Sequence, residues 1–439
     1  MTEIIVIASL LLVFAVAMTG RKRLSQSQYW TNERETPWWT IAASVSSSTV
    51  GAGTLFGVAT AGYIGGNAGA VIGIANSIGI ILFGLFISPK IFETAKVNNF
   101  YSLGDFLENI IGSKISRLAG VILFVAYFFF TAAQFAALSF IVQFITKLDY
   151  FLSVGIAALS IFAYSMVGGI RADMRTDVVQ LAFMTIFVPV IFIHIFWQGD
   201  NLVQSYLDLP IGYITGEAYQ GWTFLIAAIL LIPLSVIPSV DLWQRTFAAK
   251  SLDQAKKGFI FGGILMMILF TSFSLVGTFS FIIDPSLDPS TALMAITESV
   301  SSPIVLGILA SGLIAAILST ADTMLLASSI SLSKDVLGRS DFSAQRLTVA
   351  IICISCIVAA VAVPDVINLV VKAFSVILIL LPAVLGIFMH WWRNETALIV
   401  SVVAGGVVAL AVMFVDPLMA FVPGTFTSLI VYVVARRFV

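Results

Sequence analysis

An oxygen-rich stripe within one apolar segment is the part of the sequence best suited to bind a cation. Ser319, Asp322 and Thr323 are spaced i, i+3 and i+4, so on a helix they share one face, with Thr320 beside them. Hydroxyl and carboxylate oxygens suit hard cations such as sodium, whereas softer metals prefer Cys or His. Because ionisable groups in apolar segments mark ion pathways or functional sites, this stripe is the first candidate site.

A second candidate is Asp177, which follows Arg171 and Arg175 at the start of another apolar run. Two interpretations remain open: an acid in the first turn of a helix, stabilised by the helix dipole, or a ligand that binds sodium or carries a proton. Motifs typical of metalloproteases, other hydrolases and phosphate-binding enzymes do not occur. We therefore expect the protein not to be an enzyme.

The composition explains which solvent surrounds these residues. Of the 439 residues, 59% are hydrophobic and only 10% are charged, against roughly a quarter charged in soluble proteins. This excludes a cytosolic enzyme, a nucleic-acid-binding protein and a secreted disulfide scaffold, and the net charge of −1 implies no polyanionic partner. We expect the lipid bilayer to be the partner of most of the surface.

The apolar residues are grouped into about thirteen runs, each near the ~20 residues that a helix needs to cross a bilayer. Strands are excluded, because an open sheet cannot satisfy its backbone in lipid. The sequence predicts an all-α integral membrane protein with spans near 2–19, 38–64, 66–88, 117–146, 150–168, 176–198, 221–240, 258–283, 303–332, 345–363, 366–390, 395–414 and 416–435.

The basic residues predict the orientation. Arg21, Lys22 and Arg23 follow the first run, which places the N-terminus outside the cell and the C-terminus in the cytoplasm. We expect the protein to lie in the plasma (cell inner) membrane. When successive spans alternate in direction, every Lys and Arg, Arg245 included, lies on the cytoplasmic side, except Lys147 outside and Lys372 within a span.

The spans also predict an internal repeat. Residues 38–198 and 199–390 would form two five-helix units of opposite orientation, 1–37 an extra helix with a cytoplasmic loop, and 391–439 two accessory helices. Each unit opens with a span that cannot be a continuous helix, because Gly residues interrupt 46–54 and two Pro interrupt 232–239. Matched broken spans in inverted halves indicate the binding site of a secondary transporter.

Three stretches carry a resemblance to a known family: 168–180, with Gly-Gly-Ile-Arg-Ala-Asp; 243–257, with Trp-Gln-Arg; and 315–329, followed by Ser-Lys-Asp at 333–335. Together they resemble the sodium:solute symporter family, which has the LeuT-like five-plus-five inverted-repeat fold. The resemblance implies a main sodium site between the first broken helix and the long helix of the second repeat. Its ligands would be the carbonyls of Ser47, Val50 and Ala316 and the hydroxyls of Ser319 and Thr320.

The same resemblance implies a second site and a solute pocket. A second sodium or a proton would be held by Asp177, Asp322 and Thr323. Phe128 and Phe374 would lie near the solute. Residues expected to bind the solute are Thr49, Gly51, Thr54, Gly73, Tyr127, Gln134 and Ser239. Small side chains and few charges predict a small neutral, zwitterionic or monocarboxylate solute.

We therefore expect a secondary active transporter that couples sodium to the import of a small organic solute by alternating access. Its cofactor would be the sodium ion and its functional unit the monomer. Two alternatives remain: a proton-coupled permease of the same fold, and a membrane sensor that binds the solute without transporting it.

Overall fold

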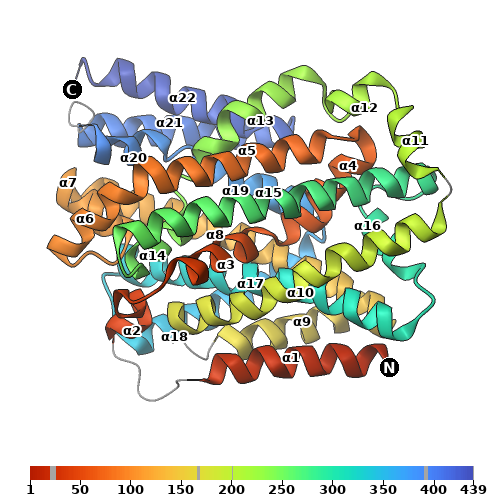
Figure 1. Cartoon of the computed structure of the whole chain (residues 1–439). Helices are drawn as coiled ribbons and strands as arrows, with labels where there is room; N and C mark the ends of the chain where they lie inside the picture. The colour runs from red at the N-terminus through yellow and green to blue at the C-terminus, as the bar shows by residue number, and fades with distance from the viewer. Residues whose placement is uncertain (20–25, 166–168, 200, 390–393, 439) are drawn as a thin grey trace.

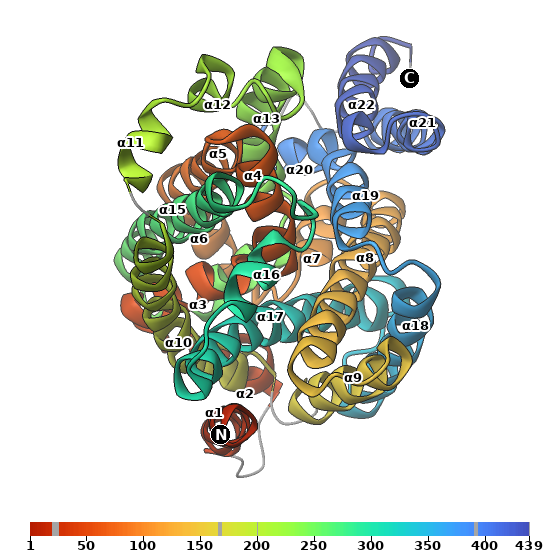
Figure 2. The ribbon, with the colours of Figure 1, turned by 90° about the vertical axis from the view of Figure 1, so that its right-hand side faces the viewer.

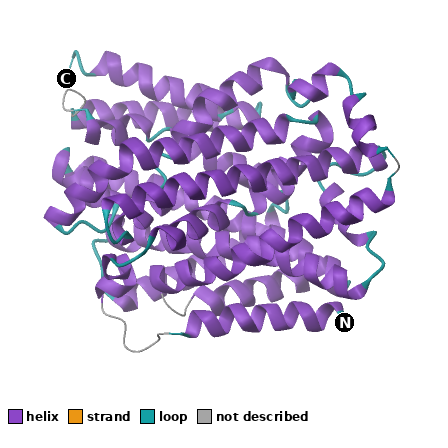
Figure 3. Ribbon diagram, in the orientation of Figure 1, coloured by secondary structure: helices purple, strands orange, loops and turns teal. Residues whose placement is uncertain are grey.

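Helices that lie side by side along one axis make up the structure (Figure 1). The computed structural model describes residues 1–19, 26–165, 169–199, 201–389 and 394–438. Within these ranges the chain forms helices and loops, and Figure 3 shows no strand among them. The all-α prediction is confirmed.

The first half of the chain runs from the N-terminal helix to a long helix that ends at Gln198. Its helices are α1 (Thr2–Met18), α2 (Gln26–Thr31), η1 (Asn32–Arg34), α3 (Trp38–Thr49), η2 (Gly53–Val58), α4 (Ala59–Gly65), α5 (Ala68–Leu82), η3 (Phe83–Ile87), α6 (Ser88–Asn98), α7 (Leu103–Ile110), α8 (Ser113–Thr146), α9 (Tyr150–Ser165) and α10 (Gly169–Gln198).

The second half begins with two short helices and ends with two helices packed against each other. Its helices are α11 (Leu202–Leu207), α12 (Ile211–Thr215), α13 (Gly221–Ser235), α14 (Val240–Ala248), α15 (Leu252–Ile283), α16 (Ala292–Glu298), α17 (Pro303–Ile330), η4 (Ser331–Val336), α18 (Phe342–Ala362), α19 (Val366–Leu378), α20 (Leu381–Phe388), α21 (Glu395–Met413), η6 (Pro417–Met419) and α22 (Phe421–Ala435).

The helices are long enough for a multi-pass membrane protein. Among the described residues nine helices could cross a bilayer, or eleven if the bent pairs α3–α4 and α19–α20 each form one span. Two predicted spans are shorter apolar helices, Thr2–Met18 and Tyr150–Ala163. The exact count of thirteen therefore stays a prediction.

Both predicted helix breaks are present. The chain bends by 56° between α3 and the segment that begins at Gly53, and residues 236–239 separate α13 from α14. The structure adds a third break, a 42° bend between α19 and α20, just before Pro382. A proline there lacks the N–H that would continue the helical ladder.

The start of α10 differs from the predicted boundary. The sequence predicts a span from residue 176, but α10 begins at Gly169, whose φ of +57° is readily adopted by glycine. Asp177 consequently lies more than two turns inside the helix. The interpretation of Asp177 as a first-turn acid is therefore wrong.

Close backbone contacts hold the centre of the bundle together. Helix α15 packs against α3, α4 and α5, while α17 packs against α8 and α10, and Figure 2 shows α17 enclosed by its neighbours. At Gly277 of α15 a Cβ atom would overlap the carbonyl oxygen of Ala59. Small residues at such crossings permit the close approach that stabilises helix pairs in membranes.

Candidate functional site

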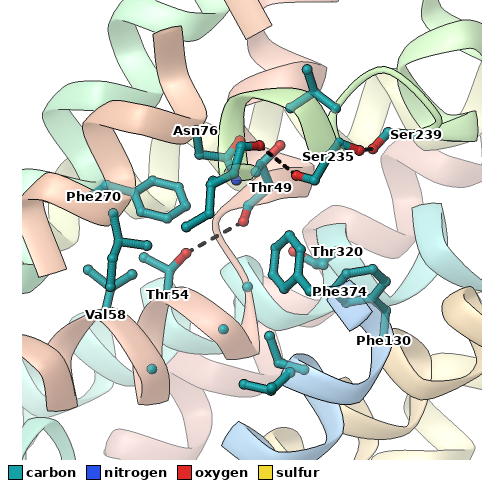
Figure 4. A pocket seen from close by; sticks show the side chains of 18 of the residues that line it. Thr49, Thr54, Val58, Asn76, Phe130, Ser235, Ser239, Phe270, Thr320 and Phe374 are labelled. Carbon is teal, nitrogen blue, oxygen red and sulfur yellow. Dashed lines mark hydrogen bonds between the residues drawn. The ribbon is translucent and has the colours of Figure 1, made fainter. Parts of the chain in front are cut away.

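A cavity of about 210 Å³ lies where the two broken spans meet. Its walls come from α3, η2, α5, α8, α13, α14, α15, α17 and α19, with η6 and α22 at one end. In Figure 4 Phe270 and Val58 lie on one side of the cavity and Phe130 and Phe374 on the other, with Thr49 and Thr54 between them. The breaks thus expose polar groups to an otherwise apolar cavity.

Most residues that the sequence predicts for the solute pocket line this cavity. Six do so: Thr49, Gly51, Thr54, Tyr127, Gln134 and Ser239. Gly73 instead faces the side chain of Phe270, since a Cβ there would lie 2.6 Å from Phe270 Cδ1. Phe374 lines the cavity, but Phe130 takes the place expected for Phe128, which packs against Phe124 and Phe129 instead.

Other cavity residues were not predicted. Asn76 of α5 and Ser235 of α13 line the wall, and so does Asp241, in the first turn of α14. The Asp241 carboxylate accepts a hydrogen bond of 2.6 Å from the Tyr127 hydroxyl. A carboxylate two residues after the second break, directly after the predicted span 221–240, was the sequence signal that could have revealed this residue.

The break after α3 packs directly against α17. Val50 leaves the helical conformation, with φ −88° and ψ 81°, and the N–H of Ala52 donates to Gln134 Oε1 at 2.9 Å rather than to a carbonyl one turn back. A Cβ at Gly51 would overlap the Thr320 hydroxyl and lie 2.6 Å from Thr320 Cβ. The unwound segment therefore lies next to one of the predicted sodium-ligand hydroxyls.

Asp177 joins the two helices of that site. Ser44 of α3 donates to Asp177 Oδ2 at 2.5 Å, and Ser319 of α17 donates to Asp177 Oδ1. All three side chains are buried. The predicted main-site residue Ser319 and the predicted second-site residue Asp177 are thus directly hydrogen-bonded.

A buried arginine completes this cluster. The Arg245 guanidinium is fully buried, and its Nη2 lies 3.4 Å from a carboxylate oxygen of both Asp173 and Asp177. Its Nε donates to Ser44 at 2.9 Å, and Nη2 donates to Thr323 at 3.0 Å. The cluster of Ser44, Asp173, Asp177, Arg245, Ser319 and Thr323, here called the ionic cluster, connects α3, α10, α14 and α17.

Arg245, which the sequence places with the basic residues of the cytoplasmic side, is therefore not a solvated loop residue but a buried one within α14. The positive-inside count treats every basic residue as solvated, but this guanidinium has two buried carboxylates as ion-pair partners. Buried charges persist in membranes when such partners compensate them.

Asp322 lies apart from the ionic cluster. It lines a second, much smaller pocket together with Tyr29, Ser165, Gly169 and Val349. Of the predicted second-site residues, the structure therefore brings Asp177 and Thr323 into one cluster, while Asp322 faces a different space.

Packed side chains separate the cavity from the end of the molecule that holds α6 and α7. The rings of Phe106 and Trp243 meet edge to face at 5.0 Å. Farther out, Ser102 donates to Asp335 at 2.6 Å, and Lys334 forms an ion pair with Asp105. In the opposite direction the cavity reaches Tyr219, Leu418 and Phe421, near the ends of α12 and α22.

The sequence comparisons with known proteins all lead to the same family. The model of the sodium:solute symporter family matches residues 29–405. The sodium/glucose cotransporter of Vibrio parahaemolyticus is 27% identical over 62% of this chain, and the chain spans about half of that relative, 53% of its length. The sodium/pantothenate symporter of Escherichia coli is 23% identical over 98% of this chain and 95% of its own.

The fold has a close counterpart among solved structures. A Na+-coupled sialic acid symporter, captured in a substrate-bound outward-open state, superposes with a TM-score of 0.86 at 17% identity. The superposition covers 100% of this chain and 97% of the symporter. At this identity the likeness establishes the LeuT-like fold alone.

Proposed function

Because the chain belongs to the sodium:solute symporter family, we propose that it couples sodium entry to the uptake of a small organic solute. Alternating access moves both into the cytoplasm through the plasma membrane. The protein transports and performs no chemical conversion, and it acts as a monomer with no nucleic-acid partner. The driving energy is about 2.3 kcal/mol per charge for each 100 mV of membrane potential.

One observation carries this proposal: the contact of the unwound segment with α17. Gly51 lies against the Thr320 hydroxyl, and the Ser319 hydroxyl beside it binds the buried carboxylate of Asp177. Carbonyls of Ser47, Val50 and Ala316 with the hydroxyls of Ser319 and Thr320 would hold sodium, a hard cation that prefers oxygen ligands. Asp177 adds negative charge next to this site.

The ends of the cavity suggest which state this is. With the N-terminus outside, the cavity reaches toward the external face at Tyr219 and Phe421, while Trp243 and Phe106 close the cytoplasmic side. We infer an outward-facing state in which the solute enters from outside. The units 38–198 and 199–390 would rock against each other, with 1–37 and 391–439 as accessory parts.

The test is thermal unfolding of the purified protein in sodium chloride and in potassium chloride. A ligand that binds only the folded state stabilises it by about 2.7 kcal/mol at a hundredfold excess over Kd. We expect a higher unfolding midpoint in sodium, and we expect Ser319→Ala and Asp177→Asn to lose this difference. Uptake into proteoliposomes under a sodium gradient then establishes symport.

Two outcomes would favour the alternatives. Equal midpoints in both salts, with uptake driven by a pH gradient, would indicate a proton-coupled permease, for which buried Asp322 in its separate pocket is the candidate proton carrier. Solute binding without accumulation in the vesicles would indicate a sensor.

A further inference from the structure

We propose that Asp241 binds the ammonium group of the transported solute, so that the substrates are small amines or amino acids. This inference rests on the proposed function and narrows it. Among the described residues that line the cavity, Asp241 alone carries a formal charge, and no Lys, Arg or His is present. The Asp241 side chain is 5% exposed, and the Tyr127 hydroxyl fixes one carboxylate oxygen at 2.6 Å.

The buried charges of the protein do not balance within the described residues. Within the described part of the chain the buried charged side chains are four carboxylates, Asp173, Asp177, Asp241 and Asp322, and one base, Arg245. The ion pairs of Arg245 go to Asp173 and Asp177, while its contact with Asp241 is to the backbone oxygen, at 3.1 Å. Because a buried carboxylate is costly unless a cation pairs with it, a cationic ligand is expected at Asp241.

The cavity that Asp241 lines fits an organic cation better than a metal ion. The Tyr127 and Phe130 rings lie 6.1 Å apart, and the Phe130 and Phe374 rings lie 5.2 Å apart edge to face. Aromatic faces attract ammonium groups, whereas sodium needs several oxygen ligands at short range. The remaining wall, including Ile72, Val58 and Phe270, suits the hydrocarbon part of a small solute.

The same wall disfavours the other predicted solutes. A monocarboxylate would place a second negative charge beside Asp241, with no basic side chain among the described lining residues to offset it. A neutral solute would leave the Asp241 charge uncompensated. Of the three predicted solute classes, the structure therefore retains the zwitterions and adds cationic amines.

The test compares matched pairs of compounds on the purified protein in excess sodium chloride. The pairs are isoamylamine with isoamyl alcohol, phenethylamine with phenethyl alcohol, leucine with 2-hydroxy-4-methylpentanoate, and phenylalanine with phenyllactate. We expect an ammonium compound to raise the unfolding midpoint and its hydroxyl counterpart to leave it unchanged. In Asp241→Asn its affinity should fall by roughly thirtyfold or more, the effect of removing one partner of a buried charge pair.

Two variants serve as controls. Like Asp241, the Asp335 carboxylate accepts a 2.6 Å hydrogen bond from a hydroxyl group, that of Ser102, but it lies outside the cavity. The Asp335→Asn variant should therefore still be stabilised by the ammonium compounds. Tyr127→Phe keeps the charge of Asp241 and removes its fixed hydrogen bond, so it should weaken binding less than Asp241→Asn does.

Each remaining outcome has one meaning. If the hydroxyl counterparts also raise the unfolding midpoint, the ammonium assignment is wrong. The same holds if sodium raises the midpoint but no ammonium compound does. In both cases the proposed sodium symport still stands. Loss of the sodium response itself in Asp241→Asn would make Asp241 a sodium ligand and also overturn the ammonium assignment. A wild type that responds neither to sodium nor to any compound would instead count against the proposed function.

Discussion

Individual residues in the ionic cluster combine stability with a candidate ion site. The Arg245 guanidinium is bound by two carboxylates and two hydroxyls, all buried. Such a group cannot be removed without leaving uncompensated negative charge in a medium that solvates it poorly. We therefore expect large losses of stability when single residues of the ionic cluster are replaced.

Arg245→Gln should destabilise the protein by about 3–5 kcal/mol, because Asp173 and Asp177 would keep their charges without a partner. Arg245→Lys keeps the charge but loses the planar fork, so its loss should be smaller. The control is Arg339→Gln, whose ion pair with Asp341 is largely exposed and should contribute less than about 1 kcal/mol. Unfolding midpoints in detergent measure all three; similar midpoints for Arg245→Gln and Arg339→Gln would contradict the role of the ionic cluster.

Gly51→Ala should abolish sodium-dependent stabilisation, because the added Cβ would overlap the Thr320 hydroxyl. Overpacking of this kind costs about 1–3 kcal/mol. Gly57→Ala is the matched control, since a Cβ there meets no atom within 4 Å. The midpoints of both variants are measured in sodium and potassium chloride, and a normal sodium response of Gly51→Ala would show that this contact is not needed for the ion.

At the scale of helices, local sequence signals predicted much of the structure. Glycines and prolines marked the breaks before η2 and between α13 and α14, because these residues interrupt the hydrogen-bond ladder. The start of α10 was not predicted, since Arg171, Asp173 and Arg175 are polar and hydropathy excludes them from a span. Their helical state depends on tertiary partners, such as Arg245 for Asp173, which lie far away in the sequence.

The candidate site was also predictable only in part. Thr49, Thr54 and Ser239 flank the breaks that the local pattern predicted, and the family resemblance identified them as pocket residues. Asp241 and Arg245 were missed as site residues because the chemistry of each depends on a contact with another helix: Tyr127 on α8 for Asp241, and Asp177 on α10 for Arg245. Such pairings cannot be derived from spacing along a single chain.

The N-terminus of α7 offers a test of one short helix. Ser102 and Asp105 form a capping box, and Ser102 also donates to Asp335 at 2.6 Å. Ser102→Ala should lower stability by more than the ~1 kcal/mol of a simple cap. Ser251→Ala, which removes only the cap of α15, is the comparison in thermal unfolding, and equal losses would mean that the contact with Asp335 contributes nothing.

The whole molecule has an orientation that can be tested at the two ends of α17. Ser301, just before this helix, and Ser340, just after η4, are both exposed. With the N-terminus outside, a membrane-impermeant maleimide should label Ser301→Cys in intact cells, and Ser340→Cys only after permeabilisation. Native Cys353 and Cys356 are buried, which keeps the background low. The reverse pattern would invert the proposed direction of the cavity.

The ionic cluster also imposes an order on biosynthesis. Asp173 and Asp177 emerge from the ribosome first, Arg245 follows 68 residues after Asp177, and Ser319 comes 142 residues after it. Until α14 has been made, Asp173 and Asp177 lack Arg245, the ion-pair partner that they have in the folded protein, so we expect the first turns of α10 to stay at the membrane surface. Complete insertion of α10 into the membrane therefore depends on helices that are translated later. In a chain truncated before α14, we expect α10 to remain incompletely inserted.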